Sequence, residues 1–254
     1  MHGSGSKHEP WKKAQFRRHA LWLAVYCLLV SCFHTKPALF TAIEAGRTDQ
    51  VRQLLDKGAD VNQRDAFNNT ALIAAVESGN LDVVSLLIDR GATINALGAF
   101  PKTALCCAAW KDNRAIGKLL LEKGADPNLQ ENNGKTPLMD AAQHGDRAFA
   151  LLLLEHLAQV DAQDTDGNTA LILAACDGRD DVVHLLIEHG AQPDKRGKNG
   201  YTALMASARF GQLACARELI HSGANKKLMS ETGHNALDIA RHFQHEDIVA
   251  LLSQ

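Results

Sequence analysis

The segment NTALIAAVESG at residues 69–79 returns almost unchanged as NTALILAACDG at residues 168–178. Three variants of the same text are KTALCCAAWKD at 102–112, KTPLMDAAQHG at 135–145 and YTALMASARFG at 201–211. A leucine marks the register and recurs every 33 residues without an insertion. The seven leucines are Leu39, Leu72, Leu105, Leu138, Leu171, Leu204 and Leu237. A fixed period of this length indicates repeated supersecondary units that stack on one another.

Each unit carries the signals of two short helices. A threonine precedes the first helix in five units, where its hydroxyl is expected to accept a hydrogen bond as an N-cap. These threonines are Thr70, Thr103, Thr136, Thr169 and Thr202. Leu72, Ala75 and Val76 are spaced i, i+3, i+4 and predict one apolar stripe on the first helix. The second helix has its own predicted stripe, made of Val83, Val84, Leu86 and Leu87.

This pattern is similar to the ankyrin repeat, and the resemblance runs from about Pro37 to Gln254. It implies an all-α fold, a solenoid of stacked helix-turn-helix units with short hairpin fingers. The first to seventh repeats are expected at about residues 37–64, 65–97, 98–130, 131–163, 164–196, 197–229 and 230–254. Because one helix pair cannot bury its apolar face alone, stability is expected to come from stacking between repeats.

Several positions depart from the repeat. Leu157 occupies a glycine position that follows the second helix, where a left-handed backbone would cost leucine about 1–2 kcal/mol. Asp112 and Gln244 replace turn glycines in the same way. Asp238 and Arg241 place charge in the first helix of the last repeat, which is expected to meet water as an end cap.

The charge of the chain is unevenly distributed. Of its 27 Lys and Arg residues, residues 1–32 hold five, and of its 29 Asp and Glu residues they hold one. The remaining 22 basic and 28 acidic residues give residues 33–254 a net charge of −6. Such an acidic segment lacks the basic surface that nucleic-acid binding requires, so no nucleic-acid partner is expected.

The sequence offers little catalytic chemistry. It contains no phosphate-binding glycine loop, no G-x-S-x-G and no H-E-x-x-H motif. His242 and His245 are three residues apart, but no second pair of metal ligands stands out, so a solvated terminal helix is the favoured interpretation. The cysteines of the repeats, Cys106, Cys107, Cys176 and Cys215, lack zinc spacing and are expected to be buried as small apolar groups. We expect no enzyme activity, no metal and no cofactor.

The N-terminal segment has the pattern of a secretory signal. Residues 20–31 are a twelve-residue apolar run behind Arg17 and Arg18, shorter than the about 20 residues of a membrane-spanning helix. The tail LVSC at 29–32 resembles a bacterial lipobox, which implies a signal peptide at 1–31, lipidation of Cys32 and a tether at 32–36. Because Phe33 follows, the resemblance favours an outer-membrane lipoprotein facing the periplasm. An uncleaved anchor, or a cytoplasmic protein with a misassigned start, is the alternative.

The resemblance also implies where a partner binds. Ankyrin repeats contact partner proteins with their finger tips and the exposed side of their first helices, which form the concave face. Six of the eight aromatic residues of the repeat region fall at these positions. The candidate binding residues are Phe67, Phe100, Lys102, Trp110, Lys111, Lys135, His144, Tyr201, Arg209, Phe210 and Phe243. Aromatic and arginine side chains are typical of interface hot spots.

The sequence therefore predicts a non-catalytic scaffold, monomeric before it binds a protein partner and anchored by lipid in a bacterial envelope. A preformed concave face suits the inhibition of a toxin or enzyme, which makes an inhibitor or immunity role one hypothesis. A cytosolic or membrane-anchored adaptor, or a structural or chaperone-like support for another envelope protein, is the alternative.

Overall fold

The computed structural model describes residues 37–99, 102–111 and 113–254. The predicted signal peptide, the tether, Cys32, Phe100 and Asp112 lie outside the described residues. Within the described ranges the backbone forms fourteen α-helices and one 3-10 helix, with no β-strand. None of these helices has the length and apolar character needed to cross a bilayer. The predicted all-α class is confirmed.

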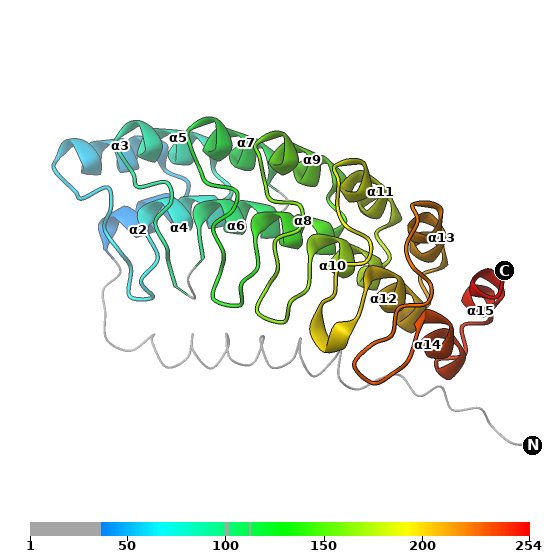
Figure 1. Ribbon diagram of the computed structural model, residues 1–254. Helices are drawn as coiled ribbons and strands as arrows, with labels where there is room; N and C mark the ends of the chain where they lie inside the picture. Colours follow the sequence, from blue (N-terminus) through cyan, green and yellow to red (C-terminus); the bar gives the residue numbers. More distant parts are fainter. Residues whose placement is uncertain (1–36, 100–101, 112) are drawn as a thin grey trace, which may run out of the picture. The chain divides into compact units, whose positions relative to one another are not determined.

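The helices alternate between two layers. The first helices of the repeats are α2 (Ala38–Glu44), α4 (Ala71–Ser78), α6 (Ala104–Trp110), α8 (Pro137–His144), α10 (Ala170–Asp177), α12 (Ala203–Phe210) and α14 (Ala236–His242). The second helices are α3 (Thr48–Asp56), α5 (Leu81–Asp89), α7 (Arg114–Glu122), α9 (Arg147–Glu155), α11 (Asp180–Glu188), α13 (Leu213–His221) and α15 (Glu246–Leu252). Each first helix packs on its own second helix and on the first helices of the neighbouring repeats (Figure 1).

Polar caps set the start of each first helix. The hydroxyl of Thr70 accepts a hydrogen bond from the N–H of Ile73, and the other four predicted threonine caps make the same contact three residues on. In the last repeat Asn235 takes this place and forms a reciprocal capping box with Asp238. The charged Asp238 thus satisfies a backbone N–H as well as closing the stack.

Burial on the two layers differs. The second helix α5 is amphipathic, and its buried side is the predicted stripe of Val83, Val84, Leu86 and Leu87. The first helix α4 buries six consecutive residues, 71–76, rather than one stripe. The prediction for the first helix was too narrow, because α2, α5 and α6 all pack against α4. Small alanines allow these close approaches on several sides.

Two residues that replace a turn glycine keep the left-handed backbone conformation typical of glycine. Leu157 has a φ of 66° and Gln244 a φ of 61°, both in the left-handed region. Leu157 also leaves its side chain 83% exposed, so it gains little by burial. The strain expected for leucine at this position is therefore present in the fold.

Candidate partner-binding face

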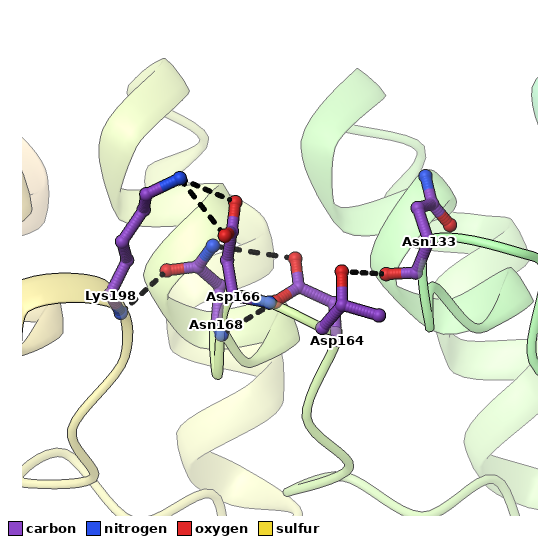
Figure 2. A network of polar contacts seen from close by, with 6 residues as sticks. Asn133, Asp164, Asp166, Asn168 and Lys198 are labelled. Carbon is purple, nitrogen blue, oxygen red and sulfur yellow. Dashed lines mark hydrogen bonds and ion pairs between the residues drawn. The ribbon is translucent and has the colours of Figure 1, made fainter.

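The side of the molecule formed by the first helices and the fingers is here called the helix–finger face. Its finger tips are hydrogen-bonded from one repeat to the next (Figure 2). Thr165 donates from its N–H to the carbonyl of Asn133, and the Lys198 ammonium contacts the Asp166 carboxylate at 2.9 Å. Within its own tip, Asp164 accepts from the N–H groups of residues 166 and 168. Three successive fingers thus hold one another in place, and this part of the face is preformed.

One group of predicted residues gathers at the end of α6. Trp110 is 49% exposed, and the Lys102 ammonium lies 5.1 Å from the centroid of its ring. The His144 ring contacts the Trp110 ring edge-on, with centroids 4.7 Å apart. His144 is oriented because its Nδ1 lies 2.7 Å from the carbonyl oxygen of Asp140, to which it donates. We call Lys102, Trp110 and His144 the Trp110 cluster; Lys111, which follows Trp110, is exposed.

Two acidic side chains lie beside this cluster, Glu131 half-buried and Asp140 buried. Glu131 lies 3.7 Å from the Lys102 ammonium, and Asp140 lies 3.8 Å from the Lys135 ammonium. Asp140 is only 2% exposed. One oxygen of each carboxylate has no hydrogen-bond partner among the described residues. Burial raises the pKa of both carboxyls, and that of Glu131 is raised further by the charge of Asp140.

Sequence reasoning missed these two acids, although the register contained a signal. In the 33-residue register the position of Asp140 is otherwise occupied by uncharged residues: Thr41, Ala74, Cys107, Leu173, Ala206 and Ile239. Glu131 stands where the second and fifth repeats have Asp65 and Asp164, whose carboxylates accept hydrogen bonds within their own tips. In the fourth repeat Asn133 accepts the tip hydrogen bond instead, which leaves the longer Glu131 free to reach Lys102.

A second group forms where the sixth and seventh repeats meet. The Arg209 guanidinium carbon lies 5.9, 5.7 and 5.3 Å from the ring centroids of Tyr201, Phe210 and Phe243. The Arg209 carbonyl also accepts a hydrogen bond from Nε2 of His245 at 3.2 Å. Tyr201 and Phe243 pack partly against the core, so these rings support the fold as well as the face. We call Arg209 and its three rings the Arg209 cluster.

The remaining candidates lie apart from these two groups or serve another role. Lys135 is mostly buried beside Asp140 and is part of the internal ion pairs rather than of the exposed surface. Phe67 is half-buried in the finger of the second repeat, where its N–H donates to Asp65. The sequence placed all of these residues on one face, but only the structure divides them into two clusters.

Three of the four cysteines in the described residues are buried thiols with raised pKa values. Burial raises the pKa of the Cys106, Cys107 and Cys215 thiols to about 12, so they are protonated at neutral pH. All three are buried, in agreement with the prediction of small apolar groups, and Cys176 is half-buried. Over the same ranges, no set of three or more His, Cys, Asp or Glu side chains is arranged to hold a metal.

Comparison with known proteins identifies the class. A family model described as ankyrin repeats (3 copies) matches residues 17–97, 39–131, 105–197 and 191–254, and the chain belongs to the ankyrin-repeat family. The chain is similar to the crystal structure of the human ASB11 ankyrin repeat domain, with a TM-score of 0.76 and 28% identity. That match covers 84% of this chain and 96% of the other. No curated protein gives a match. Ankyrin repeats are protein-binding scaffolds, and their fold is typically non-catalytic.

Proposed function

We propose that this chain binds a partner protein through its helix–finger face, with Trp110 as a central anchor. The observation that supports this most strongly is a half-exposed tryptophan flanked by Lys102 and His144. The neighbouring fingers of the fourth to sixth repeats are hydrogen-bonded to one another. Tryptophan is among the residues most enriched in interface hot spots. A surface whose fingers are already tied together loses little conformational freedom on binding, which favours affinity.

The spacing of the two clusters defines the size of the partner. Trp110 and Arg209 occupy the same position of the repeat, three repeats apart in the register. Neighbouring first helices pack about 8–10 Å apart, so three steps separate the clusters by about 24–30 Å. A ligand that engages both clusters is therefore a protein surface or a long peptide segment rather than a small metabolite.

The same proposal includes a location and a role. The basic residues and the apolar run before Cys32 support a lipid-anchored protein of the bacterial envelope, facing the periplasm. A rigid face on a tether suits the blocking of a toxin or secreted enzyme, and we propose inhibition or immunity as the role. If Cys32 carries the lipid, labelled fatty acid enters the wild type and not Cys32→Ala, which also leaves the membrane fraction. Equal membrane association of both proteins, with an intact N-terminus by mass spectrometry, would contradict the anchor.

The binding face is tested by site-specific photocrosslinking in cells that produce the full-length chain. A benzophenone side chain at exposed Lys111 lies next to Trp110, whereas one at exposed Lys118 lies on α7 in the second-helix layer. We expect one discrete crosslinked partner from position 111 and none from position 118. Capture of the same partner from position 118 alone would place the binding surface on the other layer.

A further inference from the structure

Arg209 differs from three other cations of the helix–finger face, because each of those lies beside an acid of this chain. Lys102 pairs with Glu131 and Lys135 with Asp140, while Lys198 pairs with Asp166. The guanidinium of Arg209 contacts three aromatic rings. Within residues 37–99, 102–111 and 113–254, no carboxylate pairs with it. Its charge is thus held in a fixed place without being neutralised.

The geometry of a guanidinium explains why contact with rings does not satisfy it. Aromatic rings pack on the flat face of the group, whereas its N–H donors lie in the plane and point outward from the edge. Among the described residues the Arg209 side chain donates no hydrogen bond, so its N–H groups remain available to an acceptor from another molecule. The edge of an oriented guanidinium matches the two oxygens of a carboxylate in a bidentate pair. The neighbouring rings exclude some water, which strengthens such a pair.

The repeat that contains Arg209 has a net charge opposite in sign to that of a carboxylate ligand. Residues 197–229 contain five Lys and Arg residues and one acid, Glu218, which gives this repeat a net charge of +4. The whole chain has a net charge of −2. Lys198 is already paired with Asp166, and the flanking repeats at 164–196 and 230–254 carry net charges of −4 and −3, so the excess positive charge is confined to this repeat.

We propose that the Arg209 cluster binds the carboxylate of an Asp or Glu side chain in an acidic segment of the partner protein. This inference rests on the proposed function, because the partner of the helix–finger face supplies the acid. The Trp110 cluster then contacts an apolar part of the same partner. The Arg209 cluster contributes selectivity for acidic sequences.

A short acidic peptide tests the cluster by itself. The probe is a fluorescein-labelled, C-terminally amidated hexapeptide of alternating Glu and Ala, with a second peptide in which Gln replaces Glu. Six extended residues span about 20 Å, so the probe cannot reach both clusters at once. Fluorescence anisotropy of the purified full-length chain is followed at low ionic strength, where weak charge pairs are measurable.

We expect the Glu peptide to bind about tenfold more tightly than the Gln peptide. Arg209→Gln should lose this preference, and Arg209→Lys should lose most of it, because lysine keeps the charge without the planar fork. Arg217→Gln is the matched control, since it removes one exposed charge from the same repeat on α13 and should change affinity less than about twofold. Melting curves of the three variants check that each one is folded.

Four results would overturn the proposal. The first is equal weakening by Arg209→Gln and Arg217→Gln, and the second is no binding of the Glu peptide up to about 1 mM. The third is equally tight binding of the Gln peptide with a free C-terminal carboxylate, which would assign the site to chain ends. The fourth is a dimer of the wild type that Arg209→Gln dissociates in sedimentation, which would make a second copy the occupant.

The two proposals fail separately. Trp110→Ala should leave hexapeptide binding unchanged, because the probe does not extend to α6. If Trp110→Ala also leaves capture of the partner unchanged, the proposed anchor is wrong, while the carboxylate preference of Arg209 still stands on the peptide data.

Discussion

The Trp110 cluster and the Arg209 cluster use similar residues in opposite ways. In the first, the cation Lys102 lies over the ring and beside a half-buried acid, Glu131, while the indole remains half exposed. In the second, the rings are partly buried and the cation lacks an acidic partner within the described part of the chain. One cluster offers an apolar surface to a partner and the other offers a charge.

The difference shows that a cation beside a ring is not by itself a binding signal. What matters is whether the fold already neutralises the cation. Around Trp110 the acids Glu131 and Asp140 are partly or fully buried at a cost in desolvation and pair with Lys102 and Lys135. Around Arg209 the described residues place no such acid, so the charge remains available to another molecule.

This comparison requires one continuous stack between the two clusters. Leu171 lies on α10, in the repeat between them, and is 1% exposed. Leu171→Ala should lower the free energy of unfolding by about 2–5 kcal/mol, because it leaves a cavity in the core. Urea denaturation followed by circular dichroism measures the loss. A loss below about 0.5 kcal/mol would mean that Leu171 is not a core anchor and that the clusters are not joined by this packing.

The buried acids should make stability depend on pH. The pKa of Asp140 is raised above its ordinary 3.8 by burial, so between these two values the folded chain binds more protons than the unfolded chain. Stability therefore falls as pH rises through this window and stays lower at neutral pH, by about 1.4 kcal/mol per unit of pKa.

Asp140→Asn should flatten this profile, measured by urea denaturation at a series of pH values from about 4 to neutrality. Glu131 should account for part of the remaining slope, since burial raises its pKa in the same direction. The exposed Asp89→Asn serves as a control and should leave the profile of the wild type unchanged. An identical slope in Asp140→Asn and the wild type would show that burial does not raise the pKa of Asp140.

A smaller effect is expected where neither cluster is touched. Leu157→Gly removes the left-handed strain of leucine, about 1–2 kcal/mol, against a backbone entropy cost of about 0.5–1 kcal/mol. Stability should therefore rise by about 0.5–1 kcal/mol in the same urea titration, with binding through either cluster unchanged. A loss of stability would mean that the exposed Leu157 side chain stabilises the fold by more than its backbone strain costs.

The sequence predicted the architecture because the signals for each helix pair lie close together within one repeat. The 33-residue register located the paired helices, the threonine caps and the left-handed Leu157. Each of these depends on residues close in the chain. The burial of the first helices was underestimated, because three neighbouring helices enclose α4 and periodicity within one helix cannot show this.

The candidate site was predicted only in outline. The register placed Trp110 and Arg209 on one face, but the contacts that distinguish them join different repeats. Arg209 meets Tyr201 and Phe243 from two flanking segments, and Lys102 reaches Glu131 of the next finger. Asp140 was overlooked because the pattern within one helix does not show which of its positions are enclosed by neighbouring helices; this register position is buried or half-buried in all repeats but the first.

The most direct test of the central claim is a binding titration with the partner once crosslinking has identified it. Trp110→Ala should weaken binding by about 2 kcal/mol, some thirtyfold. Asp89→Ala and Glu188→Ala, in the second-helix layer, should change affinity less than about twofold. Melting curves of all three variants should match the wild type closely. If Asp89→Ala or Glu188→Ala weakens binding while Trp110→Ala does not, the partner binds the second-helix layer and the account is wrong.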